Sequence, residues 1–353
     1  MPLFTLNPVT RRRWQRFRAI KRGYYSAIAL SVLILISLCA ELLVNSRALI
    51  VHYQGHWYFP TYGAVLSGRT FGLDYDYETD YRELKKVFAK NRAEGKDRGD
   101  WVLLPPVPYD AFETDLVAND FPPLAPSRHH WLGTDTAGRD IVARLLYGFR
   151  IAIAFSAVLL LFEYAIGISI GCLMGYWGGA FDLIFQRIIE VWSNVPTLYV
   201  IMIVASVVTP GFWTLLSIMI LFSWTGMTWY MRTASYREKA RDYVLAARAI
   251  GAGGPRIIFR HILPNSISTV VTFVPFSVAA GVTALTALDY LGFGLPPPTP
   301  SWGELLKQGT DNLESPWIVT SVVVAMTLVL MLVTFMGEAI REAFDPKVFK
   351  TYE

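Results

Sequence analysis

Long apolar runs separated by polar segments dominate the hydropathy pattern of this 353-residue chain. A helix needs about 20 mostly apolar residues to span the hydrocarbon of a bilayer. Six runs satisfy this condition: 24–44, 151–174, 186–208, 212–231, 265–288 and 317–337. Glu190, Asn194 and Pro196 interrupt the third run, and Pro196 is expected to kink it. The pattern predicts an all-α membrane protein with six transmembrane helices.

The basic residues orient these spans. Seven Lys and Arg lie in residues 11–22 and seven more in the loop 232–260, whereas the loop 289–316 carries only Lys307. Because basic residues near span ends stay on the cytoplasmic side, we expect both termini in the cytoplasm. The resulting plan is a basic tail (1–23), a first span (24–44), an extracytoplasmic insertion (45–127), a core with five spans (128–338) and a cytoplasmic tail (339–353).

Composition supports this class and excludes others. Hydrophobic residues make up 53% and charged residues 17% of the chain, whereas about 25% charged is usual for globular domains. Basic clusters with interleaved stacking aromatics are missing, so a nucleic-acid partner is not expected. The chain also lacks the glycine-rich lysine motif of a nucleotide-binding loop and any catalytic signature. We therefore expect no enzyme activity and no cofactor.

The polar, basic segment 241–265 (RDYVLAARAIGAGGPRIIFRHILPN) separates two spans. Tyr243, Ala247 and Ile250 lie at i, i+4 and i+7, so a helix would present them as one apolar edge. Gly251 is placed to end that helix at a position that needs a positive φ. The segment thus predicts a helix–turn–helix along the cytoplasmic face, and the alternative is an ordinary basic loop.

A second distinctive stretch, HWLGTDTAGRDIVARLLYG, runs from residue 130 to 148. Thr134 or Asp135 can cap a helix whose first turn holds Gly138 to Asp140. Because Arg139 and Asp140 cannot face lipid, this helix is expected at the outer interface. A rival interpretation makes His129, His130 and Asp135 metal ligands. It is disfavoured because adjacent histidines point to different sides and no third histidine is near.

A third stretch covers residues 288–306, LDYLGFGLPPPTPSWGELL. Residues 296–300 are expected to be stiff and extended. Ser301 and Glu304 form the S-x-x-E pattern of a capping box and predict a short helix. The alternative is a plain turn between spans, whereas a rigid run before a capped helix favours a re-entrant structure at the outer mouth of a pathway.

Small and ionisable residues inside the spans give further predictions. Gly167, Gly171 and Gly175 repeat every four residues and indicate close packing against another helix. Glu163 and Glu190 are ionisable groups in or near spans, which suggests either a pathway or a paired group. Glu190 can pair with Arg187. Neither glutamate has the chain of partners that a proton relay needs.

The three stretches resemble one protein family. Ala246-Ala247, Gly251 and Leu263-Pro264 match the spacing of the EAA loop of bacterial ABC importer permeases, with Leu245 in place of the glutamate. Residues 130–148 and 288–306 resemble two motifs of the C-type permeases of dipeptide and oligopeptide importers. Within that group the chain most resembles the permease of microcin C-type peptide importers.

The resemblance implies a type I ABC importer permease fold with six transmembrane helices and a coupling loop at 232–264. The residues it implies for coupling to an ATPase are Tyr243, Leu245, Ala246, Ala247, Ile250, Gly251 and Pro264. Those implied for an extracytoplasmic gate or receptor-docking surface are Gly133, Thr134, Asp135, Gly138, Arg139, Asp140, Pro297, Pro298, Ser301 and Trp302. Glu163 is a candidate for the pathway.

The family also implies partners and a location. They are a second homologous permease, two ABC ATPase subunits that hydrolyse the ATP, a periplasmic or lipid-anchored peptide-binding protein, and the lipid bilayer of the bacterial inner membrane. Two other functions stay open. One is a proton-coupled secondary transporter that uses Glu163 and Glu190, and the other is a scaffold that acts through its extracytoplasmic loop.

Overall fold

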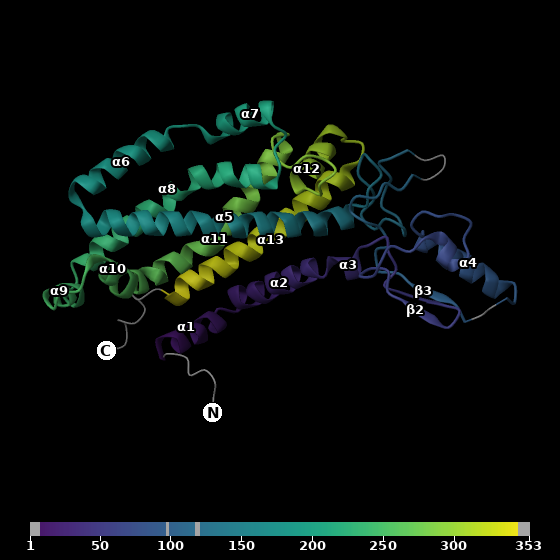
Figure 1. Ribbon diagram of the computed structural model, residues 1–353, viewed down its shortest axis with the longest axis horizontal. Helices are drawn as coiled ribbons and strands as arrows, with labels where there is room; N and C mark the ends of the chain where they lie inside the picture. Colours follow the sequence, from purple (N-terminus) through teal and green to yellow (C-terminus); the bar gives the residue numbers. More distant parts are fainter. Residues whose placement is uncertain (1–7, 97–98, 117–120, 345–353) are drawn as a thin grey trace. The chain divides into compact units, whose positions relative to one another are not determined.

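The computed structural model describes residues 8–96, 99–116 and 121–344, which form two compact units (Figure 1). The first, here called the helix unit, comprises the described parts of 1–31, 152–296 and 327–353. The second, here called the insertion unit, comprises the described parts of 32–151 and 297–326. Three long helices, α2 (Lys21–Leu38), α5 (Ile141–Trp177) and α13 (Pro316–Phe344), contribute to both units.

The helix unit is built from apolar helices. Beside its parts of α2, α5 and α13 it contains α1 (Pro8–Ala19), α6 (Gly179–Ser193), α7 (Thr197–Val207), α8 (Phe212–Lys239), α9 (Asp242–Ala249), α10 (Gly254–Ile257) and α11 (Leu263–Tyr290). A π-helical turn, Ile258–Ile262, joins α10 to α11 without a break. The second helix of the expected helix–turn–helix is therefore the start of the following span.

Five helices, namely α2, α5, α8, the Val270–Tyr290 part of α11, and α13, are long and apolar enough to cross a membrane. The sixth expected span is the pair α6 and α7, which meet at 62°. Pro196 lies just before α7, where its missing N–H and its restriction of residue 195 end one helix and begin another. The expected kink is thus a break. The all-α membrane class is confirmed, with six spans when the bent pair counts as one.

The glycine repeat on α5 packs against α8, as predicted. A Cβ atom added at Gly167, Gly171 or Gly175 would lie within 2.5–2.8 Å of α8 atoms. At Gly171 the nearest atom is the backbone oxygen of Thr228, at 2.5 Å. Because a backbone atom cannot rotate away, the two helices need glycine at this point.

Gly171→Ala should therefore destabilise the protein, whereas Gly226→Ala should not. Overpacking of a well-packed contact costs about 1–3 kcal/mol, while a Cβ atom at Gly226 on α8 would meet nothing within 4 Å. The comparison is the melting temperature of the two purified variants in the same detergent. Equal melting temperatures for both variants and the wild type would contradict the close approach of α5 and α8.

The insertion unit contains a small antiparallel sheet. Its strands are β1 (Ile50–Tyr53), β2 (His56–Tyr58) and β3 (Trp101–Leu103), in the order β2-β1-β3. Val51 on β1 is paired with Tyr58 on β2 and with Val102 on β3. The unit's other helices are α3 (Ala40–Leu43), the 3-10 turn Gly68–Phe71, α4 (Tyr81–Ala93) and α12 (Trp302–Asp311).

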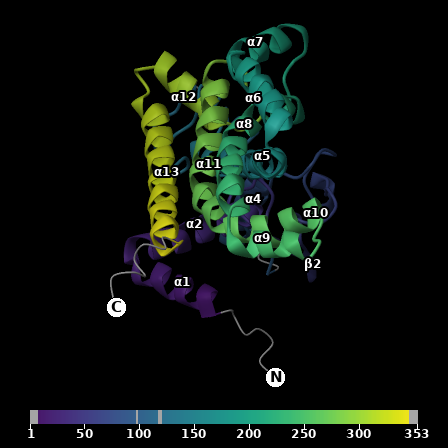
Figure 2. The same cartoon turned by 90° about the vertical axis from the view of Figure 1, so that its left-hand side faces the viewer.

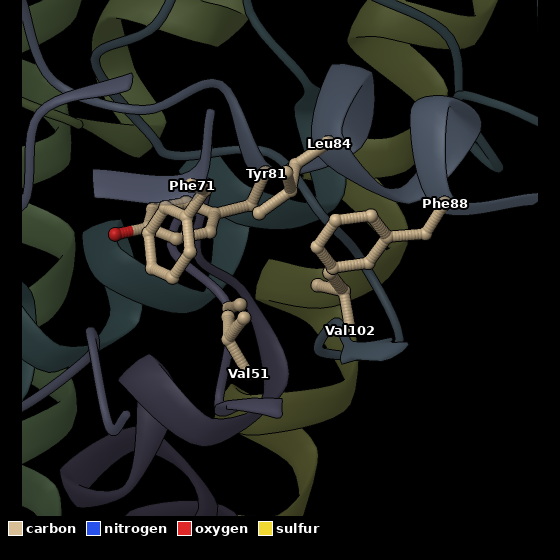
Figure 3. Packing of buried hydrophobic residues seen from close by; sticks show 7 residues of the cluster. Val51, Phe71, Tyr81, Leu84, Phe88 and Val102 are labelled. Atoms are coloured by element: carbon tan, nitrogen blue, oxygen red, sulfur yellow. The ribbon is translucent and has the colours of Figure 1, made fainter. Parts of the chain in front are cut away.

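Helix α4 covers one face of this sheet. It begins at Asp80, whose side chain accepts hydrogen bonds from the backbone N–H groups of Arg82 and Glu83. Tyr81, Leu84 and Phe88 pack from the helix onto the sheet and the 3-10 turn, through Val51, Phe71 and Val102 (Figure 3). Helix α4 is therefore amphipathic, with one buried face and an exposed face that carries Glu83, Lys85, Lys86 and Lys90.

Candidate functional site

Helix α9 ends in a backbone motif that requires glycine. Gly251 has φ +85°, and its N–H donates to the carbonyl oxygen of Arg248 at 3.0 Å. The N–H of Ala252 donates to the carbonyl oxygen of Ala247 at 3.0 Å. This pair of bonds is the Schellman motif, which satisfies the last carbonyls of a helix. The positive φ predicted for Gly251 is confirmed.

Helix α9 does not present Tyr243, Ala247 and Ile250 as one apolar edge, contrary to the prediction from the sequence. Val244 is buried in a small core with Ile257 and Ile262. Ala247 is also buried, so it does not share an exposed edge with Ile250. The exposed apolar face consists of Leu245, Ala246, Ala249 and Ile250. Ile250 is 87% exposed. Sequence reasoning missed Ala249, although the i, i+1, i+4, i+5 spacing of these four residues could have indicated it.

Tyr243 connects α9 to the end of α8. Its hydroxyl donates to a carboxylate oxygen of Glu238 at 2.7 Å. Burial and the negative charge of Glu238 raise the pKa of Tyr243 to about 12. Glu238 is itself buried, and it lies within α8, which extends into the region predicted as loop. Pro264 is the second residue of α11 and directly follows the π-helical turn that joins this helix to α10, to which it has no N–H to donate.

A second polar link joins α6 to α8. The two carboxylate oxygens of Asp182 accept from Arg232 Nε at 2.6 Å and from Arg232 Nη2 at 2.7 Å. The hydroxyl of Tyr236 donates to Asp182 at 2.8 Å. Sequence reasoning missed this cluster, because its members are 50 and 54 residues apart. Such bidentate pairs fix geometry as well as charge, so the ends of α6 and α8 are held together.

The insertion unit contains a buried network of charges. Arg139 Nε donates to Asp135 at 2.7 Å, and Arg139 Nη2 donates to Glu304 at 2.9 Å. Arg144 forms ion pairs with Glu304 and, at 3.3 Å, with Asp135. Its side chain is fully buried. Arg144 was not predicted from the sequence, although an arginine one turn into an apolar helix is itself a signal. Glu304 was expected only as the capping partner of Ser301.

Arg144 also holds two segments together through three carbonyl oxygens. Its guanidinium donates to Ala111 at 3.1 Å, to Pro298 at 3.3 Å and to Thr299 at 3.4 Å. These acceptors come from the insertion and from the loop before α12. Residues 297 and 298 form a turn, so the stretch expected to be extended is bent where it meets Arg144.

Asp140, and neither Thr134 nor Asp135, caps helix α5. Asp140 Oδ1 accepts from the N–H of Ala143 at 3.0 Å, and α5 begins at Ile141. The carboxylate of Asp135 instead accepts from the backbone N–H groups of Ala137 and Arg139, both at 2.9 Å. The earlier cap was wrong because Gly138 has φ +80°, so the chain turns there before the helix begins.

His130 lies between two carboxylates. Its Nδ1 is 2.8 Å from Asp140 and its Nε2 is 3.3 Å from Asp115. Burial alone would lower the pKa of His130, but the hydrogen bonds and charges of Asp140 and Asp115 outweigh it and raise the pKa. Both ring nitrogens are thus engaged by the protein. Within the described residues no group of three or more His, Cys, Asp or Glu is arranged to hold a metal ion.

Helix α12 completes the network. Ser301 caps it by accepting from the N–H of Glu304, as the S-x-x-E pattern predicts. Trp302 is 3% exposed; its Nε1 donates to the carbonyl oxygen of Leu145 at 2.9 Å. Its ring lies against Gly148, where an added Cβ atom would be 2.8 Å away.

Burial changes what the predicted gate residues can do. Eight of the ten are buried within the insertion unit: Gly133, Thr134, Asp135, Gly138, Arg139, Asp140, Ser301 and Trp302. They have no surface to offer to another protein and can only hold the loops in place. Pro297 and Pro298 are exposed. Trp131, which is 56% exposed, was not among the predicted residues.

The two glutamates of the spans have different surroundings. Glu190 pairs with Arg187, as the sequence suggested. Glu163 is half-buried on α5, and within the described parts of the chain it makes no hydrogen bond or ion pair. The structure therefore does not connect these groups into a relay.

Apolar spans on both sides of a helix with an exposed apolar face describe an integral membrane protein with a docking helix outside its spans. The family model described as "Binding-protein-dependent transport system inner membrane component" matches residues 167–350. The chain belongs to this family. It is accordingly a multi-pass inner-membrane permease component of an ABC transporter, and the predicted permease fold is confirmed.

Three relatives illustrate the match. The inner membrane ABC transporter permease protein YejE of Escherichia coli is 43% identical over 97% of this chain and 98% of that protein. The peptidoglycan transport system permease protein YejE of Agrobacterium fabrum is 37% identical over 97% and 94%. The oligopeptide transport system permease protein OppC of Bacillus subtilis is 32% identical over 69% and 79%. The first two matches include the insertion, since they cover nearly all of this chain.

Proposed function

We propose that this chain is the C-type permease of an ATP-driven peptide importer and forms the translocation pathway with a second, homologous permease. The relatives named for oligopeptide and peptidoglycan transport support a peptide or a peptide-bearing cell-wall fragment as the substrate. A peptide antibiotic of the microcin C type belongs to the same class. The exposed apolar face of α9 is the observation that carries the proposal, because a rigid apolar helix outside the spans suits docking to another protein.

In this mechanism α9 transmits movement and catalyses nothing. Two ATPase subunits bind the α9 helices of the two permeases, and ATP-driven closure of the ATPases pulls those helices together. The Tyr243–Glu238 bond fixes α9 to α8, and the packing of Val244 with Ile257 and Ile262 fixes it to the helix that continues into α11, so the pull reaches the spans. A peptide-binding protein delivers substrate on the opposite side. Transport is then a shift between inward- and outward-facing populations, driven by nucleotide and by the loaded receptor.

A strain that lacks this chain tests the substrate class. Plasmid-borne wild type should restore both the uptake of labelled cell-wall tripeptide and sensitivity to microcin C. If only oligopeptide uptake were restored, the chain would still be a peptide importer permease, but cell-wall tripeptide and microcin C would be excluded as substrates. A transporter driven by protons would work without the ATPase partners and would fail with Glu163→Gln. The importer proposed here requires the ATPases and tolerates that substitution.

Labelling with an impermeant thiol reagent tests the orientation. In a background without Cys39 and Cys172, a cysteine at Lys90 on α4 should react in intact spheroplasts, because that side chain is 77% exposed and the insertion faces outward. A cysteine at Ala249 on α9, also exposed, should react only after the membrane is permeabilised. The opposite pattern would place α9 outside and exclude its contact with cytoplasmic ATPases.

A further inference from the structure

Helix α1 is basic and amphipathic. Residues 8–22 contain seven Lys and Arg and no acidic residue. On the other side of the helix, Phe17 is buried against Ala339 and Ala343 of α13. Trp14 is 50% exposed and stacks on Phe17, with ring centroids 5.8 Å apart. Such helices lie in the interface of a membrane, with the apolar face inward and the basic face toward the headgroups.

A cavity of about 380 Å³ opens between α1, α11 and α13. Phe17, Ile340 and Phe344, with Trp14 and Val271, form an apolar wall, and Thr10 and Arg13 supply the polar atoms. Figures 1 and 2 both place α1 beside the C-terminal end of α13. The cavity therefore combines a long apolar surface with a cationic rim.

The cationic rim is not neutralised within the described residues. Arg13 lies over the ring of Phe344, with its guanidinium carbon 4.6 Å from the ring centroid. Arg22 pairs with Glu338 at 3.3 Å. In the part of the chain that the structure describes, the exposed residues Arg11, Arg12 and Lys21 form no ion pair. Arg13 alone of these residues lines the cavity, and the three exposed basic residues add a positive excess near its apolar wall.

We propose that this cavity binds an anionic phospholipid, with an acyl chain along Phe17, Val271 and Ile340 and the phosphate at Thr10 and Arg13. A soluble anion would leave the apolar wall unfilled, and a zwitterionic lipid would leave the positive excess uncompensated. A phosphodiester with a hydrocarbon tail matches both parts. The site is separate from peptide transport, and it attaches the N-terminal helix to the membrane surface.

Native mass spectrometry of the purified full-length chain tests the site, with phosphatidylglycerol and phosphatidylcholine as probes. Wild type should retain phosphatidylglycerol in preference, and inorganic phosphate should not displace it. Arg13→Ala should weaken retention about five-fold, the factor that corresponds to one basic residue near an anionic surface. Val271→Trp should abolish retention by filling the cavity while leaving every charge in place. Lys85→Ala on α4 removes one positive charge from the insertion unit and should change nothing.

Three outcomes would overturn the proposal. Equal retention by Val271→Trp and wild type would mean that basic residues attract lipid without a site. Equal retention of the two lipids would mean that the charge plays no part. Retention that requires removal of residues 345–353 would assign the cavity to the chain's own C-terminal segment. Because Val271 is only half-buried, melting temperatures of all variants separate lost binding from misfolding.

Discussion

Replacing Gly251 with proline should abolish peptide uptake while leaving the chain inserted in the membrane. The change forces φ from +85° toward about −65° and removes the N–H that donates to Arg248. The last turn of α9 then unwinds, and its exposed apolar face loses its fixed position. The test measures uptake of labelled peptide by cells that carry the variant. Immunoblotting of the membrane fraction measures insertion.

Gly253→Pro is the matched control. This glycine lies two residues after Gly251, and its backbone φ is already one that proline adopts. Gly253 has φ −70°, and a Cβ atom there would meet nothing within 4 Å. It should retain transport. If Gly251→Pro transported normally, α9 would not be the coupling element, and a scaffold function of the insertion would gain support.

Replacing Arg144 with leucine should destabilise the insertion unit by about 3–5 kcal/mol, the usual cost of leaving a buried charge without its partner. Glu304 would keep only Arg139, and the carbonyl oxygens of Ala111, Pro298 and Thr299 would lose their donor. The detergent-solubilised variant should therefore melt well below the wild type. Receptor-stimulated ATPase activity of the assembled transporter should fall more than its basal activity, because the outer loops are displaced.

Two further variants make this test specific. Arg144→Leu with Glu304→Leu should be less destabilised than the sum of the single changes, since the second removes a carboxylate that has already lost one of its two ion-pair partners. Arg150→Leu breaks the pair with Glu41, whose side chains are 37% and 29% exposed, and should cost about 0–1 kcal/mol. Equal melting of Arg144→Leu and Arg150→Leu would show that the buried network does not stabilise the unit.

The features that the sequence predicted well are those set by neighbouring residues. Hydropathy located the spans, because crossing a bilayer leaves the backbone few alternatives to a helix. Gly251 predicted the end of a helix and Ser301 predicted the start of one, because both roles depend on hydrogen bonds between residues close together in the sequence. The glycine repeat on α5 indicated a close contact, although it did not name α8 as the partner.

The predictions failed where contacts with segments distant in the sequence determine the local structure. Ala247 was placed on the exposed edge because the edge was drawn from periodicity alone, whereas the core under α9 comes from Ile257 and Ile262. Asp140 caps α5 in place of Asp135 because the chain turns at Gly138 and the helix begins only at Ile141, while Asp135 binds Arg139 and Arg144. The fold of the insertion was also beyond reach, since β1 and β3 are joined across some fifty residues whose pattern is weakly periodic.

The distance between Arg144 and Glu304 along the chain also affects how the protein is made. The two residues are 160 positions apart, so at ordinary rates of synthesis roughly ten to thirty seconds pass between them. During that interval Arg144, near the start of an apolar helix, has been synthesised, whereas Glu304, which completes the neutralisation of its charge, has not. Asp135 precedes Arg144 in the sequence, so its carboxylate can pair with Arg144 before Glu304 has been synthesised. The start of α5 therefore cannot complete its ion pairs before α12 has been synthesised, so the formation of this network is a late step in the folding of the protein.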